Sequence, residues 1–476
     1  MEKKNTWETY SDKQLKELEK FSKEYMQFLD QGKTERECID TIVNQIEKAG
    51  YRELEQVRKS GKTLQKGDKL YSVCMNKSIV MFQMGEKSMT EGMNILGAHL
   101  DSPRLDVKQN PLYEDGGFAY LDTHYYGGVK KYQWVTIPLA LHGVVVKKDG
   151  TTVEISIGEE EDDPVFFISD LLVHLAQEQL EKKAAKVIEG EALDLIIANK
   201  PLKIEKKDKN KTNDNKAEES AKEAVKAGVL AILKEQYEIE EEDFISAELE
   251  IVPAGHAREA GFDRSMILAY GQDDRVCAFS SLKAMLEVGE VERTACCILV
   301  DKEEIGSVGA TGMQSKFFEN AVAEVLNLTG EYSELNVRRT LANSCMLSSD
   351  VSSAFDPSYA SCFDKKNVAY LGGGMVFNKF TGSRGKGGSN DANAEYLGHL
   401  RQIFDKKKVN FQTAELGKVD LGGGGTIAYI LALYGMNVID SGVAVLNMHA
   451  PWEATSKADV FEAKRGYLAF LECAGM

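Results

Sequence analysis

The residues best suited to chemistry follow an apolar run that extends from Cys296 to Val300. Such a run is typical of a buried strand, and two adjacent carboxylates, Glu303 and Glu304, come shortly after it. Adjacent side chains on an extended chain point in opposite directions, so the two groups suit different tasks. In a metal-dependent hydrolase, one carboxylate binds a metal ion and its neighbour accepts a proton from the attacking water. On these residues alone an ordinary solvated turn is the alternative, and the rest of the chain decides between the two.

A second apolar run, from Met93 to Gly97, leads into His99 and Asp101. Residues two apart on a strand lie on one face, so the Asp101 carboxylate can orient the His99 imidazole toward a metal ion. A His-x-Asp pair also arises by chance, and alone it does not establish a site.

Other candidate ligands stand in similar positions at or after apolar segments: Asp273, Asp350 and His449. With His99 and Glu304 they make two imidazoles and three carboxylates. This is the ligand set of a hydrolytic site with two metal ions and a shared carboxylate. Mixed imidazole and carboxylate ligands suit zinc, with cobalt and manganese as alternatives.

Composition excludes several classes of protein. The chain has 476 residues, which favours two or more structural units. Its formal net charge of -17 argues against nucleic acid or an anionic membrane as a partner. The eight cysteines form no CxxC pair and no disulfide framework. No apolar run approaches the roughly 20 residues that span a bilayer, and the polar start, Met1 to Lys13, lacks a signal-peptide pattern. We therefore expect a cytoplasmic protein.

The sequence predicts an α/β fold in which a second domain interrupts the first. Residues 1–107 and 250–476 carry the apolar runs that end in carboxylates or imidazoles, whereas residues 108–249 differ in texture. In this middle section, a turn at Lys148 to Thr151 predicts antiparallel strands. The segment from Ser169 to Ala176 is predicted to be a helix that carries His174. The polar stretch from Lys203 to Lys222 is predicted to be a solvated loop.

Three further elements are predicted in the first domain. Apolar residues at helical spacing predict a helix from Ser11 to about Ala49, with Ser11 as its N-cap. Residues Val73 to Met84 are predicted to form a strand. An amphipathic helix from Lys457 to Cys473 is predicted to close the chain.

The order of the motifs resembles that of the aspartyl aminopeptidase family, which includes the vacuolar aminopeptidase I enzymes. The family belongs to a larger clan of co-catalytic zinc exopeptidases. The motifs are His-x-Asp-Ser-Pro at His99, Asp-Asp-Arg at Asp273, Asp-x-Glu-Glu-Ile-Gly-Ser at Asp301, Ser-Ser-Asp at Asp350 and Met-His at His449. They run through nearly the whole chain in family order.

The resemblance implies a ligand set for two zinc ions. His99 and Asp350 would bind one ion, and Glu304 and His449 would bind the other. Asp273 would bridge the two.

The resemblance also implies roles for residues that are not ligands. Asp101 would orient His99, and Glu303 would be the general base. In the clan the bridging carboxylate comes first in its doublet, which favours Asp273 over Asp274. A histidine in the matching segment of the inserted domain lies near the substrate in this family. His174 is therefore a candidate substrate-binding residue, with a satisfied core histidine as the alternative.

For the whole molecule, the resemblance implies a zinc-exopeptidase-like catalytic domain with a mixed sheet flanked by helices. The inserted β-rich domain would serve dimerisation, and dimers would build a tetrahedral dodecamer. The expected activity is removal of N-terminal residues from short peptides with a free N-terminus. The loop from Gly382 to Gly388 departs from the animal-type members and leaves a preference for acidic N-terminal residues open. The alternatives are another amidohydrolase or carboxypeptidase of the clan, or a non-catalytic assembly protein.

Overall fold

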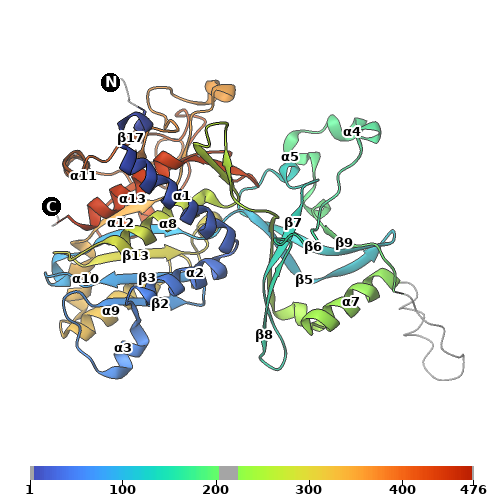
Figure 1. Ribbon diagram of the computed structural model, residues 1–476, viewed down its shortest axis with the longest axis horizontal. Coiled ribbons are helices and arrows are strands. Elements are labelled where there is room, and N and C mark those ends of the chain that lie inside the picture. Colours follow the sequence, from blue (N-terminus) through green and yellow to red (C-terminus); the bar gives the residue numbers. More distant parts are fainter. Residues whose placement is uncertain (1–4, 203–222, 474–476) are drawn as a thin grey trace, which may run out of the picture. The chain divides into compact units, whose positions relative to one another are not determined.

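The computed structural model describes residues 5–202 and 223–473 (Figure 1). The chain divides into two compact units, and each is described by itself. The first unit comprises Met1–Ser102 and His256–Met476, and the second comprises Pro103–Gly255. The predicted loop from Lys203 to Lys222 lies outside the described residues.

The boundaries between the units differ from the predicted positions, 107/108 and 249/250. Strand β5 (Arg104–Asp115) pairs with β10 (Ala247–Pro253), with Leu105 opposite Ile251 and Asp106 opposite Glu250. The ends of both strands therefore belong to the sheet of the second unit. This pairing over long sequence separation moves the boundary outward at both ends.

A nine-stranded mixed sheet forms the centre of the first unit. In sheet order its strands are β1 (Arg52–Glu53), β2 (Lys69–Cys74), β3 (Ser78–Gln83), β13 (Ala295–Val300), β4 (Asn94–His99), β14 (Cys345–Ser349), β18 (Asn437–Gly442), β16 (Met375–Asn378) and β17 (Phe411–Ala414). The neighbouring strands β13, β4, β14 and β18 are parallel and almost wholly buried. Their carboxyl ends therefore meet at one edge, where open α/β sheets bind ligands.

Helices cover both faces of this sheet. One apolar core includes residues of α1 (Asp12–Gln31), α2 (Glu35–Lys48), α8 (Gln272–Glu287), α11 (Ala394–Lys407) and α13 (Lys457–Leu471). The other core includes residues of α3 (Leu54–Ser60), α9 (Phe317–Thr329), α10 (Glu334–Ala342) and α12 (Ala428–Ala432). Figure 1 shows α1, α8 and α13 on one side of the strands and α3 and α9 on the other. The prediction of a mixed α/β fold is confirmed.

A smaller five-stranded sheet lies in the same unit. Its strands, in order, are β11 (Arg258–Ala260), β12 (Met266–Ala269), β20 (Glu453–Ser456), β19 (Ala444–Leu446) and β15 (Ser352–Ser353). Strand β12 leads into the turn before Asp273, and His449 lies in the loop between β19 and β20. This sheet therefore positions the candidate ligands that do not follow the central parallel strands.

Two predicted elements of the first unit are each divided in two. The single helix predicted from Ser11 is broken at Gly32, and a second capping box at Thr34 starts α2. The predicted N-cap at Ser11 is confirmed. The strand predicted from Val73 to Met84 is part of a hairpin, because Met75 and Asn76 turn with φ of 50° and 53°. The closing helix is confirmed as α13.

The second unit is built on a six-stranded antiparallel sheet. Its strands, in order, are β8 (Thr152–Ile157), β7 (Leu139–Val146), β10, β5, β6 (Phe118–Tyr126) and β9 (Leu195–Ala198). Among the described residues of this unit, the α-helices are α4 (Gln177–Leu180), α5 (Ala184–Val187) and α7 (Ala224–Tyr237). The predicted turn at Lys148 to Thr151 joins β7 and β8 and is confirmed.

The helix predicted from Ser169 to Ala176 is wrong. Only Val173–Leu175 form one 3-10 turn there, and most side chains of the segment are exposed. An apolar run becomes a stable helix chiefly by packing one face, and this run packs little within the unit.

Among the described residues, no helix is long and apolar enough to cross a membrane.

Candidate metal centre

Three central strands bring candidate ligands to one edge of the nine-stranded sheet. His99 is the last residue of β4, and it lies opposite Val300, the last residue of the parallel strand β13. Asp350 directly follows β14, the other neighbour of β4. Because these strands run in the same direction, their ends converge without any long loop.

The turn after β13 is tied to the end of β4. Lys302, with φ of 68°, reverses the chain so that Glu303 begins a short 3-10 helix. The Asp101 carboxylate accepts the backbone N–H groups of Glu303 and Glu304, each at 3.1 Å. His99 Nδ1 lies 2.9 Å from the Asp101 carbonyl oxygen and 3.3 Å from its carboxylate. Asp101 therefore contacts both segments, and its carbonyl is closest to the imidazole.

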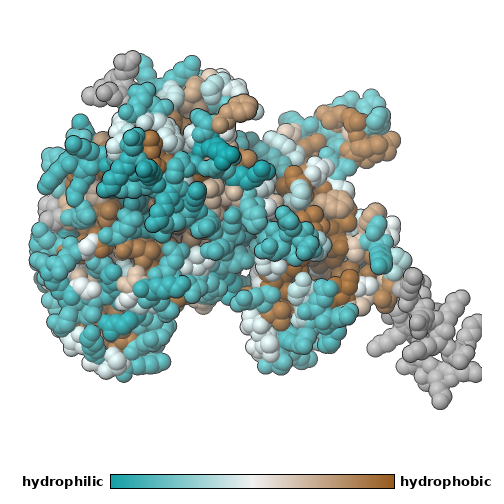
Figure 2. Space-filling view, in the orientation of Figure 1, coloured by the Kyte–Doolittle hydropathy of each residue, from teal (hydrophilic) through white to brown (hydrophobic). Residues whose placement is uncertain are grey.

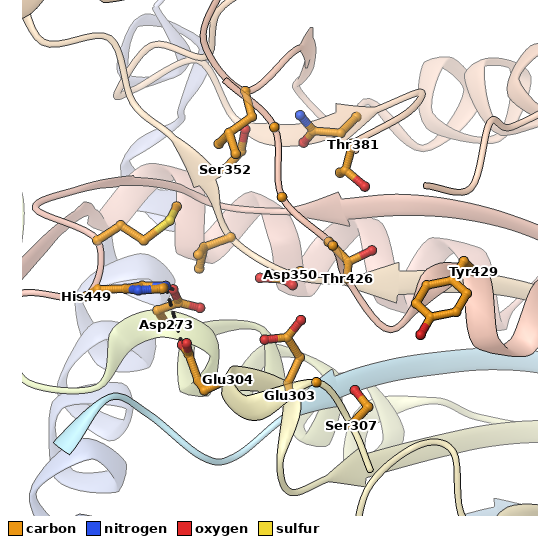
Figure 3. A pocket seen from close by; sticks show the side chains of 18 residues that line it. Asp273, Glu303, Glu304, Ser307, Asp350, Ser352, Thr381, Thr426, Tyr429 and His449 are labelled. Atoms are coloured by element: carbon orange, nitrogen blue, oxygen red, sulfur yellow. Dashed lines mark ion pairs between the residues drawn. The ribbon is translucent and has the colours of Figure 1, made fainter. Parts of the chain in front are cut away.

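Asp273 lies between the two predicted histidine ligands. Its Oδ1 is 3.4 Å from His99 Nε2, and its Oδ2 is 3.3 Å from His449 Nε2. Glu304 Oε1 lies 3.4 Å from the same nitrogen of His449. Figure 3 shows the side chains of Asp273, Glu304 and His449 pointing toward one another. One carboxylate thus faces two imidazoles with different oxygen atoms.

The remaining carboxylates lie on the His99 side of the centre. Asp350 Oδ1 and Glu303 Oε2 are each 3.9 Å from His99 Nε2. Asp274 can also approach a common point with His99 and Asp350. However, its Oδ2 accepts the backbone N–H of His99 at 3.4 Å. Asp273 thus differs from Asp274 in that its two oxygens face both imidazoles.

The charge of the centre fits a bound cation. Burial and neighbouring carboxylates raise the pKa of Glu303 to about 8, and burial also raises the pKa of Glu304 and Asp350. Burial opposes ionisation of His99, but contacts with Asp101 and Asp273 outweigh this effect and raise its pKa. Among the described residues, no donor hydrogen-bonds to Glu304 Oε1, although this atom is buried. A divalent cation would stabilise the ionised carboxylates.

The types of donor atom also fit zinc. Described residues form three groups whose ligand atoms lie within 4.8 Å of one another: His99 with Asp274 and Asp350, His99 with Glu303 and Glu304, and Asp273 with Glu304 and His449. Imidazole nitrogen and carboxylate oxygen are common zinc ligands. All of the metal ligands predicted from the sequence occur in these groups.

A cavity of about 490 Å³ opens over the centre. Asp273, Glu303, Glu304, Asp350 and His449 line it. Its other walls come from residues that the sequence did not single out as site residues: Ser307, Ser352, Asn378, Thr381, Leu416, Thr426, Tyr429 and Met448 among them. Figure 3 shows several of these side chains around the carboxylates. The glycine run Gly422 to Gly425 is a sequence feature that could have indicated this cavity, because glycines let the backbone come close to a ligand and Gly423, Gly424 and Gly425 line the cavity.

His174 belongs to the second unit and is exposed on its 3-10 turn. The interpretation as a satisfied core histidine is therefore wrong. Its predicted contact with substrate stays a prediction.

Comparisons with known proteins agree with this chemistry. The family model described as aminopeptidase I zinc metalloprotease (M18) matches residues 28–471. A probable M18 family aminopeptidase 1 from Clostridium acetobutylicum is 60% identical and covers 99% of this chain and 98% of its own length. The crystal structure of an M18 family aminopeptidase from Thermotoga maritima has a TM-score of 0.91 at 44% identity, with 99% of each chain covered.

A more distant structure, the mApe1 dodecamer of S. cerevisiae, has a TM-score of 0.73 at 19% identity. It covers 94% of this chain and 95% of its own, and shows a shared fold. The match over most of the chain and the high identity to the bacterial relative decide the family. The chain belongs to the M18 family of zinc metalloproteases and is a metal-dependent aminopeptidase.

Proposed function

We propose that this aminopeptidase is co-catalytic, with two divalent metal ions per subunit, and that it trims short peptides from a free N-terminus. The observation that carries the proposal is the position of Asp273, whose two oxygens face the imidazoles of His99 and His449. A carboxylate in that position suits a bridge between two ions. A single ion would leave one of these two imidazoles without a metal ion to bind.

Five residues would hold the ions: His99 and Asp350 on one side, Glu304 and His449 on the other, and Asp273 shared. Zinc is the metal of the family model, with cobalt and manganese as alternatives. When bound, divalent zinc supplies Lewis-acid activation of water and of the peptide carbonyl.

Glu303 is the proposed general base. It lines the cavity beside the ligands, and Figure 3 shows its carboxylate directed into that space. It would accept a proton from the attacking water and return it to the leaving amine. Burial and the neighbouring carboxylates raise the pKa of Glu303, and bound cations would lower that pKa again and favour the ionised form that accepts a proton. Asp101 would assist by orienting His99 and by holding the turn that carries Glu303.

A preference for acidic N-terminal residues is also proposed. A second cavity of about 330 Å³ shares Thr381 with the metal cavity and is lined by three cations, Arg384, Lys386 and Lys418, and by one carboxylate, Glu415. Lys386 already pairs with Asp391 at 2.8 Å. The other two cations would favour a carboxylate on the substrate.

A panel of aminoacyl amides tests these proposals directly. We expect cleavage that requires a free α-amine, rates that are highest for aspartyl and glutamyl substrates, and two metal ions per subunit by mass spectrometry. Cleavage of N-acetylated substrates would instead favour a deacylase or carboxypeptidase of the clan. A preparation without metal or activity would favour a non-catalytic assembly protein.

We propose that the chain forms a homo-oligomer, a tetrahedral dodecamer built from dimers through the inserted domain. The second unit exposes an apolar segment at residues 167–180, with Leu172, Val173 and Leu175 each more than half exposed. Figure 2 shows apolar side chains at the surface around α4 in this unit. Assembly would bury them and would bring His174, in the same segment, to substrate.

A cytoplasmic location is proposed as well. No disulfide joins any of the eight cysteines, all of which lie among the described residues, as is usual in a reducing compartment.

A further inference from the structure

One buried carboxylate near the metal centre has no role in the proposed ligand set. Glu453, the first residue of β20, is 1% exposed. Its Oε2 accepts the backbone N–H of Asp273 at 3.0 Å, and its Oε1 accepts the backbone N–H of His449 at 2.7 Å. Each oxygen therefore holds the main chain of a different candidate ligand.

The backbone of Glu453 is itself fixed. It pairs with Ala269 across the antiparallel strands β12 and β20. Its carbonyl oxygen accepts the Gln272 side-chain amide at 2.6 Å. The five-stranded sheet thus fixes the position of the Glu453 carboxylate, and the carboxylate binds the two ligand segments by hydrogen bonds.

This arrangement matches the one on the other side of the centre. There the Asp101 carboxylate accepts the backbone N–H groups of Glu303 and Glu304, each at 3.1 Å. Both carboxylates are buried, and each uses both oxygens to hold two residues of the centre. The small sheet pairs β12 with β20, but Asp273 and His449 lie in segments outside these strands, and the Glu453 carboxylate holds the two segments together.

We propose that Glu453 is a positioning residue that sets the distance between the Asp273 carboxylate and the His449 imidazole, and thereby the affinity for the metal ion on the Glu304–His449 side. The inference rests on the ligand assignment of the proposed function. Asp273 Oδ2 lies 3.3 Å from His449 Nε2, so a small shift of either backbone would alter this pair. Groups that orient metal ligands typically affect metal affinity by about 10- to 100-fold.

The chemistry of the two hydrogen bonds specifies a carboxylate. Glutamine has nearly the same shape, but it offers one acceptor oxygen and one NH₂ donor. In Glu453→Gln one backbone N–H would face a donor instead of an acceptor. Aspartate would keep both acceptors on a shorter side chain. Glu453→Gln therefore tests the loss of one hydrogen-bond acceptor, and Glu453→Asp tests a shorter side chain with both acceptors kept.

The test measures metal binding to the full-length protein without substrate. Metal-free Glu453→Gln is titrated with zinc against a competing chelator, and thermal unfolding is followed in parallel. We expect the affinity for the ion on the Glu304–His449 side, which would bind both held ligands, to fall by about 10- to 100-fold. The ion on the His99–Asp350 side would share only Asp273, and its affinity should fall less. Glu453→Asp should recover part of the lost affinity.

The control is Asp459→Asn in α13. Asp459 is buried and accepts the backbone N–H groups of Gly372 at 2.8 Å and Gly374 at 2.7 Å, neither of which is a candidate ligand. This variant removes the same kind of double acceptor from another loop. We expect it to lower the unfolding temperature and to leave both zinc affinities unchanged.

Several outcomes would overturn the inference. One is a Glu453→Gln protein with the stability loss of the control and wild-type affinity for both ions. Equal weakening of both ions would also contradict it, because that indicates general loosening. If Glu453→Gln does not fold, Glu453→Asp alone decides between the same outcomes. Binding of a single ion by the wild-type protein would instead refute the ligand assignment, independently of Glu453.

Discussion

At the scale of single residues, Glu303 is the group whose chemistry is easiest to isolate. Glu303→Gln keeps the size of the side chain and removes its ability to accept a proton. We expect kcat to fall by about 10²- to 10⁴-fold, the usual contribution of general acid–base catalysis, while metal content stays at the wild-type level. The exposed Glu334→Gln is the control and should retain full activity. Full activity of Glu303→Gln would require Glu303 and Glu304 to exchange roles.

Asp273→Ala should act on the metals first and on turnover only as a consequence. Because its two oxygens face different imidazoles, its loss removes a ligand from both proposed ions. We expect both ions to be lost on dialysis, which mass spectrometry of the dialysed protein measures. Asp274→Ala is the comparison. Should that variant lose both ions while Asp273→Ala keeps them, the shared carboxylate would be the second of the pair.

The candidate ligands could be predicted because each is a metal-binding type of residue at or after an apolar segment. The structure brings His99, Glu304, Asp350 and His449 together around Asp273. Their roles stay predictions.

Glu453 could not be predicted from its surroundings in the sequence. Its partners are backbone N–H groups, which every non-proline residue carries. They come from a distant segment and from a nearby loop. Sequence patterns reveal side-chain types, whereas contacts with backbone groups depend on which segments the tertiary fold brings together.

At the scale of elements, the close packing of β18 against the end of β14 positions Asp350. A Cβ at Gly442, the last residue of β18, would lie 1.9 Å from the Asp350 carbonyl oxygen. Gly442→Ala must therefore displace the backbone that carries a candidate ligand. We expect a loss of about 1–3 kcal/mol in the free energy of unfolding, as overpacking typically costs, together with lower activity. Urea unfolding and peptide assays measure the two effects.

The control for this substitution is Gly398→Ala. Gly398 lies inside α11, and nothing is within 4 Å of the position of an added Cβ. Alanine in a helix interior stabilises by about 0.5–1 kcal/mol relative to glycine. Equal behaviour of the two variants would show that Asp350 tolerates displacement of its backbone.

The errors in predicted elements have local causes. Hydrophobic periodicity continues across Gly32, so α1 and α2 were predicted as one helix, although Thr34 supplies a second capping box. The hairpin turn at Met75 and Asn76 could not be recognised from the sequence, because it contains no glycine. Both residues nevertheless adopt the positive φ that glycine usually provides in such turns. The segment around His174 has helical spacing, but its apolar side chains remain exposed within the unit. Its conformation therefore depends on packing and not on spacing.

At the scale of the whole molecule, buried carboxyl groups give folding stability a dependence on pH. Burial raises the pKa of Asp459 from 3.8 to about 8, so the folded state binds its proton more tightly than the unfolded state. This group stabilises the fold most below its unfolded pKa, and its contribution is lost as pH rises through about 8. The free energy of unfolding of the wild type relative to that of Asp459→Asn should therefore decline from about pH 5 to about pH 9, a range that includes the folded pKa of about 8. Urea unfolding at several pH values measures this, and a constant difference would contradict it.

Assembly is the last property of the whole molecule, and the inserted unit should control it. An acidic chain of net charge -17 does not associate casually, so an oligomer requires a shaped apolar interface. The 167–180 segment offers one, and Val173 in it is 70% exposed. We expect Val173→Asp to yield smaller particles by light scattering, with the metals of each subunit retained.

The control for assembly is Leu433→Asp, which changes a side chain 80% exposed in the first unit. It should leave the particle size at the wild-type value, because Leu433 lies outside the 167–180 segment and in the other unit. If the active sites face an enclosed chamber, intact folded proteins should resist trimming while short peptides are cut at full rate. A fully active wild-type monomer, or rapid trimming of a folded protein, would contradict both the assembly and its effect on substrate size.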